Sequence, residues 1–153
     1  FVLRLPLARG PGWGPFALFR GVDGTLLILA GGGVVLRRAG APEVVLERGR
    51  APFPFPGEMA YQCELVEGPV RDFNLMVDRA SAEATLDVVR LVAWGAFRLV
   101  AGRWWLYGWE GQVEVAGERL APEELLEVDG PGIMRAGDGA GARVLAIHFI
   151  PRG

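Results

Sequence analysis

The stretch "LILAGGGVVLRRAG", Leu27 to Gly40, decides the fold that the sequence predicts. It holds two apolar runs of strand length with three consecutive glycines between them. A second stretch, "LYGWEGQVEVAG" from Leu106, aligns with it at an offset of 79, so that Gly32 meets Gly111. Internal repeats are the signature of a fold built from repeated units, so the chain is predicted to contain two similar β units of about 75 residues.

The alignment continues beyond these stretches with a shrinking offset. Two further dipeptides match, Ala39-Gly40 with Ala116-Gly117 at 77 and Pro56-Gly57 with Pro131-Gly132 at 75. Carried on at 75, "RDFNLMV" falls opposite "AIHFIP", which sets Asn74 in the closing strand of the first unit and His148 in that of the second. We therefore expect a first β-barrel unit over residues 1–79 and a second over 80–153, packed together as one compact domain.

Strand-length apolar segments recur along the whole chain, separated by breaks that draw on 23 Gly and 11 Pro. Turn signals at roughly ten-residue spacing are typical of a β-sandwich or barrel. One segment, "APEELLEV" over residues 121–128, fits a short helix as well as a strand. With the repeat, the pattern predicts an all-β, cupin-like double barrel of two jelly-roll-like units.

Composition excludes several classes of protein. The net charge of -2 is scattered, and no basic run could bind a phosphate backbone. We expect no membrane segment, because no apolar run approaches the length of a span and no signal peptide is visible. A lone Cys63 fits a reducing cytoplasm. The scarcity of Asn, Gln and Cys suits a thermophile, which the sequence leaves open, and since the chain begins at Phe1 without Met we expect residues upstream.

The inventory of reactive side chains limits the chemistry. Cupin metal sites need several His or carboxylates converging on one ion, and this chain has one His, so we expect no metal and no cofactor. His148 is interpreted as a partly buried side chain in an apolar strand. Ser81 lacks a nucleophile turn, Cys63 is interpreted as a small buried hydrophobe, and "AGGGV" over 30–34 as a hairpin rather than a phosphate loop.

The single Asn of the chain, Asn74, lies in "GPVRDFNLMVDR" over residues 68–79. On an extended strand Asp72, Asn74 and Met76 share one face, and the apolar residues between them share the other. An Asn offers both an amide donor and a carbonyl acceptor, so inside a barrel it can recognise an amide group. The same residues are also compatible with a buried polar network that only ties strands together.

The longer stretch "FPFPGEMAYQCELVEGPVRDFNLMVDR", Phe53 to Arg79, resembles the signature of the HutD/Ves family. That signature is Phe-x-Gly-Asp, a strand, and then Gly-Pro-x-x-Asp-Phe-Asn-x-Met-x-x-Arg. Residues 1–36 are similar to the family's earlier aromatic-x-x-Arg strand and Gly-rich hairpin. The resemblance implies a cupin-like double barrel, an association with histidine utilisation, and a regulatory, non-catalytic role in binding a small acidic metabolite such as N-formylglutamate.

The resemblance also implies which residues bind the ligand: Arg4, Glu58, Asp72, Asn74, Met76 and Arg79, with Glu58 where the family has Asp. A ligand carboxylate would suit a bidentate Arg, for which Arg4 is the first candidate and Arg79 the second. Three features depart from the family pattern. Its N-terminal Trp-Lys/Arg-Asn-Gly-Gly segment is absent, Gly24 stands in place of an Arg, and Ala17 in place of a Ser.

Two other classes of function remain open. A metal-free cupin enzyme, an isomerase or lyase, requires an acid/base pair near Asn74. A structural or interaction protein requires an exposed apolar patch, which "RWWLYGW" over residues 103–109 could supply. On that strand Trp104 or Trp109 is expected to become buried through self-association, so a homodimer is left open.

Overall fold

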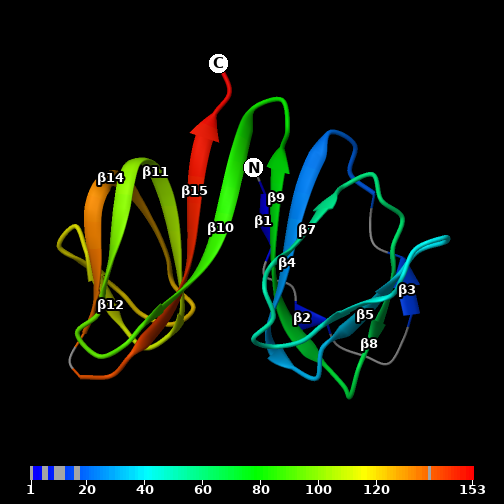
Figure 1. Ribbon diagram of the computed structural model, residues 1–153, viewed down its shortest axis with the longest axis horizontal. Helices are drawn as coiled ribbons and strands as arrows, with labels where there is room; N and C mark the ends of the chain where they lie inside the picture. Colours follow the sequence, from blue (N-terminus) through cyan, green and yellow to red (C-terminus); the bar gives the residue numbers. More distant parts are fainter. Residues whose placement is uncertain (1, 5–6, 9–12, 16–17, 138) are drawn as a thin grey trace. The chain divides into compact units, whose positions relative to one another are not determined.

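The computed structural model describes residues 2–4, 7–8, 13–15, 18–137 and 139–153, with side chains described from residue 18 onward. Strands and turns make up all the secondary structure of these residues, which confirms the all-β prediction. The chain divides into two compact units, Phe1–Ser81 and Ala82–Gly153 (Figure 1). The sequence places this division two residues earlier.

Unit 1 consists of two antiparallel sheets. In the first sheet β9 (Val70–Asp78) lies between β1 (Val2–Arg4) and β4 (Val22–Gly31), β7 (Phe53–Pro56) pairs with β4, and β2 (Leu7–Ala8) pairs with the start of β9. The second sheet has the order β3 (Trp13–Pro15), β8 (Gln62–Leu65), β5 (Val34–Arg37) and β6 (Val44–Leu46).

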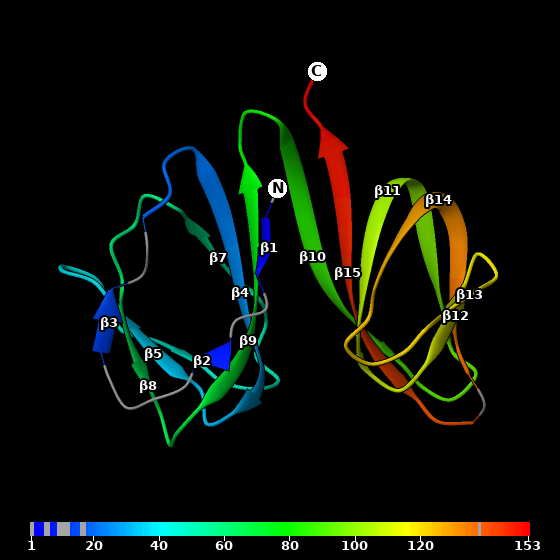
Figure 2. The same cartoon turned by 180° about the vertical axis from the view of Figure 1, so that it is seen from behind.

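Unit 2 has one six-stranded antiparallel sheet, which Figure 2 shows from behind. Its order is β10 (Ala82–Leu91), β15 (Ala142–Pro151), β11 (Ala96–Glu110), β14 (Leu125–Ala136), β12 (Val113–Val115) and β13 (Glu118–Leu120). The ambiguous segment 121–128 forms a turn followed by the start of β14, so its strand interpretation is correct.

The apolar core of unit 1 fixes which face of β9 points inward. Leu26 and Ile28 of β4 pack in one buried cluster with Met76 of β9, and burial of each large side chain contributes about 1.5–3 kcal/mol. Because side chains alternate along a strand, Asp72 and Asn74 lie on the same face as Met76. Both therefore face this apolar core.

The three glycines of residues 31–33 do not form the expected hairpin, and that prediction is wrong. β4 and β5 belong to different sheets, because β5 pairs with β6 and β8. A Cβ on Gly31 would collide with the carbonyl oxygen of Pro69, and one on Gly32 with that of Val66. The glycines instead let the chain cross between sheets against closely approaching backbone.

Each unit contains an antiparallel strand pairing with the same register pattern as the other. The β4–β9 pairing of unit 1 matches the β11–β15 pairing of unit 2 residue by residue. Each pairing also shifts register at the equivalent place, between Ile28 and Ala30 in unit 1 and between Gly108 and Glu110 in unit 2. The matching inward pairs are Gly24↔Met76 with Trp104↔His148, Leu26↔Asn74 with Leu106↔Ala146, and Ile28↔Asp72 with Gly108↔Val144. Residues therefore correspond at an offset of 80 from β4 to β11 and 72 from β9 to β15.

This correspondence corrects the sequence alignment at its end. Asn74 lies in β9 and His148 in β15, the last strand of each unit, as expected. The offset of 75 was wrong by three residues, because Asn74 corresponds to Ala146 and His148 to Met76. The Pro-Gly match that set this offset was misleading, because Pro56-Gly57 lies at the end of β7 whereas Pro131-Gly132 lies inside β14.

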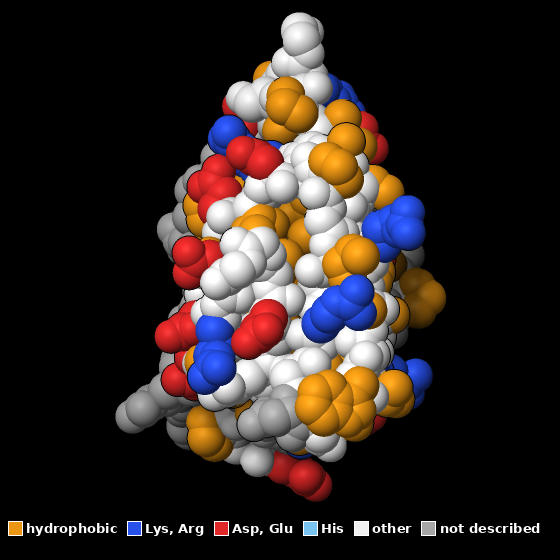
Figure 3. Space-filling model, turned by 90° about the vertical axis from the view of Figure 1, so that its left-hand side faces the viewer, with side chains coloured by type: hydrophobic (Ala, Val, Ile, Leu, Met, Phe, Trp, Pro, Cys, Tyr) orange, Lys and Arg blue, Asp and Glu red, His pale blue; other side chains and the backbone are white. Residues whose placement is uncertain are grey.

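Trp104 and Trp109 of β11 are already buried within the chain. Trp104 stacks on His148 with ring centres 4.3 Å apart and donates its indole N–H to the carbonyl of Val100. Trp109 is buried, and the Arg143 guanidinium lies 4.7 Å from its ring centre. The prediction that self-association buries Trp104 or Trp109 is wrong. On the face shown in Figure 3, hydrophobic and charged side chains are interspersed.

Candidate functional site

Asp72 is the buried carboxylate of unit 1. The residue is 8% exposed, and among the described residues the only hydrogen-bond donor to its carboxyl group is its own backbone amide. Burial raises the pKa of Asp72 to about 6, because an apolar surrounding disfavours the charged form. A carboxyl group in this position exchanges its proton close to neutral pH.

Asn74, the next inward residue of β9, holds a buried oxygen with no partner. Within the described part of the chain, nothing donates a hydrogen bond to Asn74 Oδ1. Leaving a buried polar atom unpaired costs about 1–3 kcal/mol, so such atoms are rare and need an explanation. Asn74 pairs in the ladder with Leu26 on one side and with Arg4 on the other. The side chain of Arg4 lies outside the described residues.

Aromatic side chains pack against the same apolar core of unit 1. Phe53, Phe55 and Tyr61 form a cluster with ring centres 6.0 to 6.4 Å apart, and they pack against the core of unit 1. The ring of Phe55 fills the space that a Cβ on Gly24 would need. A larger residue at position 24 would therefore displace the ring of Phe55.

Cys63 lies partly buried against the same core. Burial raises the pKa of its thiol, and the negative charge of Asp72 raises it further. The thiol is therefore protonated at neutral pH and is a weak nucleophile, in agreement with its interpretation as a small hydrophobe.

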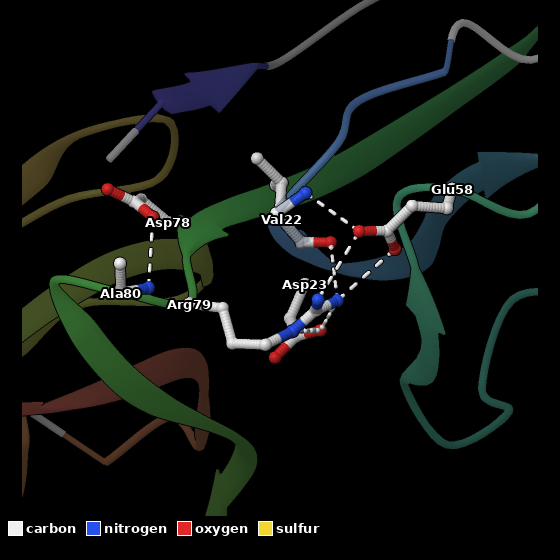
Figure 4. Close-up of polar contacts among 7 residues, drawn as sticks. Val22, Asp23, Glu58, Asp78, Arg79 and Ala80 are labelled. Atoms are coloured by element: carbon white, nitrogen blue, oxygen red, sulfur yellow. Dashed lines mark hydrogen bonds and ion pairs between the residues drawn. The ribbon is translucent and has the colours of Figure 1, made fainter.

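Arg79 and Glu58 form a separate, more exposed cluster at the end of β9 (Figure 4). Arg79 Nη2 donates to Asp23 Oδ1 at 2.7 Å and to Glu58 Oε2 at 3.2 Å, and Glu58 Oε1 accepts from the Gly21 amide at 2.7 Å. The hydrogen bond from Arg79 is the main cause that lowers the pKa of Glu58 to about 2. These contacts join β9, the start of β4 and the turn after β7.

The residue pattern and the fold both have counterparts in known proteins. A model of the HutD family matches residues 1–144. The chain belongs to the HutD family. In the HutD family, its structure resembles that of HutD from Pseudomonas fluorescens SBW25, solved in a formate condition, with 30% identity and a TM-score of 0.80 over 99% of this chain and 80% of that one. This similarity confirms the prediction of a cupin-like double barrel.

Two further proteins are similar to the chain, one in structure and one in sequence. The conserved protein of unknown function PA5104 from Pseudomonas aeruginosa PAO1 is 28% identical, with a TM-score of 0.82 over 99% of this chain and 84% of that one. Protein Ves from Citrobacter koseri is 35% identical over 89 residues, which are 58% of this chain and 46% of Ves. The chain thus matches about half the length of this curated relative.

The structure sorts the six predicted HutD-type site residues into three places. Asp72, Asn74 and Met76 face the core of unit 1, whereas Glu58 and Arg79 bind each other. Arg79 follows Asn74 by five residues, or about 16 Å of extended strand. Arg4 is placed by register alone. Sequence reasoning missed Asp23 and Phe55, although the alternation of "FPFP" was a signal for a strand with one aromatic face.

The described residues gather no three of His, Cys, Asp and Glu that could hold a metal ion. The same part of the chain contains no helix able to span a membrane. His148, the only histidine, is partly buried and stacked on Trp104.

Proposed function

We propose that this HutD family member is a non-catalytic, regulatory binding protein whose ligand is a small acidic metabolite such as N-formylglutamate. The binding site is the interior of unit 1 at Asp72, Asn74 and Met76, with Arg4 at the adjoining register position. The observation that carries the proposal is the buried Oδ1 of Asn74, which has no partner among the described residues, beside the buried carboxyl group of Asp72. A ligand that pairs with these groups removes the penalty of their burial.

Unit 2 supplies the argument against a purely structural role. At the positions that correspond to Asp72 and Asn74 it carries Val144 and Ala146, which are both buried. The same ladder therefore forms without a polar pair, so the fold does not require one. A network that only tied strands together would also leave no oxygen unpaired.

Two further observations support a binding role. A related HutD was solved in a formate condition, and formate is the smallest carboxylate. A metal-free cupin enzyme would need a second acid or base beside Asp72. Cys63 is poorly suited to that role, because its pKa is raised. The single Cys fits a cytoplasmic location.

Thermal melting of two proteins, with a third as control, tests the proposal. The first is the parent chain, and the second carries Asp72→Val and Asn74→Ala, the residues of unit 2 at these positions. N-formylglutamate at a hundredfold excess over its dissociation constant is expected to stabilise the parent by about 2.7 kcal/mol. The double variant is expected to fold and to show no shift. Glu114→Gln, which changes an exposed ion pair of unit 2, serves as the control that keeps the shift.

The opposite pattern would sink the proposal. In that case no member of a panel of histidine-pathway metabolites shifts the melting of the parent, and the double variant is less stable than the parent. Asp72 and Asn74 would then contribute to the fold rather than to ligand binding.

A further inference from the structure

We propose that the ligand of unit 1 presents an N–H group to Asn74 Oδ1, with the carboxyl group of Asp72 as the second acceptor. The site would thus select amides and amines and discriminate against acids that lack N–H. This inference rests on the proposed function and specifies the chemistry of the same site.

The unpaired buried atom that the described residues contain is a hydrogen-bond acceptor. Asn74 Oδ1 has no donor among the described residues, and Asp72 receives only its own backbone amide. An acceptor is satisfied only by a donor, and an ionised carboxylate has none to offer. A ligand carboxylate therefore cannot pair with Asn74 Oδ1, whereas an amide or ammonium N–H can.

The charges around Asp72 lead to the same conclusion. Within the part of the chain that the structure describes, no Arg bonds its carboxyl group, and its ladder partner is the apolar Ile28. Arg79 is already held by Asp23 and Glu58. A second carboxylate next to Asp72 would meet repulsion in an apolar surrounding, while a donor would be attracted. Any acidic group of the ligand must lie away from Asp72.

The spacing of the two acceptors constrains the donor group. Asp72 and Asn74 are two residues apart on one strand face, which separates their Cβ atoms by about 7 Å. Hydrogen bonds of about 2.9 Å allow one nitrogen with two hydrogens to reach both side chains. A secondary amide, with a single hydrogen, reaches Asn74 alone.

Calorimetric titration with three matched probes tests the inference. N-formylglutamate has two carboxylates and an amide N–H, N-formyl-N-methylglutamate has the same groups without the N–H, and glutarate has the carboxylates without the amide. The parent protein is expected to bind N-formylglutamate at least tenfold more tightly than either other probe, or about 1.4 kcal/mol.

The Asn74→Ala variant separates hydrogen bonding from steric fit. Its residue is the one unit 2 carries at the corresponding position, Ala146, so the strand is expected to form. N-formylglutamate should lose at least tenfold in affinity and fall to parity with its N-methyl analogue, while glutarate affinity stays unchanged.

Each other result has a definite meaning. If the parent binds the N-methyl analogue or glutarate as tightly as N-formylglutamate, the N–H inference is overturned and the binding role survives. Full discrimination in Asn74→Ala would also overturn it, because the cause would then be steric. Binding of none of the three probes would refute the proposed function, and the inference with it.

Discussion

Asp72 and Glu58 are two carboxylates of one unit whose environments shift their pKa values in opposite directions. Burial raises the pKa of Asp72 to about 6, whereas the hydrogen bond from Arg79 is the main cause that lowers that of Glu58 to about 2. The stabilising contribution of Glu58 is therefore present above its ordinary pKa of 4.5 and is lost as the pH falls toward 2. The stabilising contribution of Asp72 has the opposite dependence on pH, because its pKa is raised.

The protonated form of Asp72 is the one that the folded state favours. The contribution of Asp72 to stability is fully present below pH 3.8, its ordinary pKa, and is lost as the pH rises through about 6. We expect the unfolding free energy to fall by about 3 kcal/mol from this group between pH 3 and pH 8. Asp72→Asn should remove that loss and be more stable than the parent at pH 8. Urea unfolding at both pH values measures this, and equal pH slopes in the two proteins would contradict it.

At the scale of the element, both units use a glycine just past the register shift of the ladder. Gly31 has φ 97° and Gly111 has φ 71°, and a Cβ on either would collide with a carbonyl oxygen, that of Pro69 or Gly141. The shift bends the strand, and the glycine lets the neighbouring chain approach closely. Gly31 and Gly111 therefore occupy equivalent positions in the two units.

Replacement of Gly31 by Ala should therefore destabilise the protein more than the same change at Gly40. Both residues have positive φ, but a Cβ on Gly40 meets nothing within 4 Å. We expect Gly40→Ala to cost about 1 kcal/mol and Gly31→Ala at least about 1 kcal/mol more, because backbone conformation and collision add. Chemical denaturation of both variants measures the difference. Equal losses would show that the backbone around Gly31 moves aside.

The sequence predicts strands best where apolar and polar residues alternate. β9 and its inward triad of Asp72, Asn74 and Met76 follow from that alternation alone. β7 was missed because its two prolines read as a turn, although an edge strand tolerates them. The contacts of Arg79 could not be predicted, because they join residues 21 and 56 positions apart.

At the scale of the whole molecule, the two units differ in the inward-facing residues of their equivalent strands. Unit 1 holds Asp72 and Asn74, whereas unit 2 holds Val144 and Ala146 and stacks His148 on Trp104. The family signature covers the first of these halves, and the sequence repeat was too weak to align the second correctly. Only the strand pairing makes the comparison possible.

This difference predicts an asymmetric response to exchanged residues. Val144→Asp with Ala146→Asn places polar groups in the core of unit 2 without a ligand to meet them. We expect a loss of about 1–3 kcal/mol for each group, whereas Asp72→Val with Asn74→Ala in unit 1 should be neutral or stabilising without ligand. Urea unfolding of both double variants at pH 7 measures the contrast. Similar losses in both would mean that each unit needs its own residues.

The equivalent strand pairing of the two units also has a consequence for how such a chain can evolve. Hydrogen bonds between backbone groups hold β9 beside β4, so a change of side chain at positions 72 and 74 leaves the pairing in place. Unit 2 has the same pairing with apolar residues at these positions, so the architecture does not require polar residues there. Selection can consequently alter what the interior recognises while the scaffold persists, and new specificities in this lineage should arise at these inward positions before they arise in the loops.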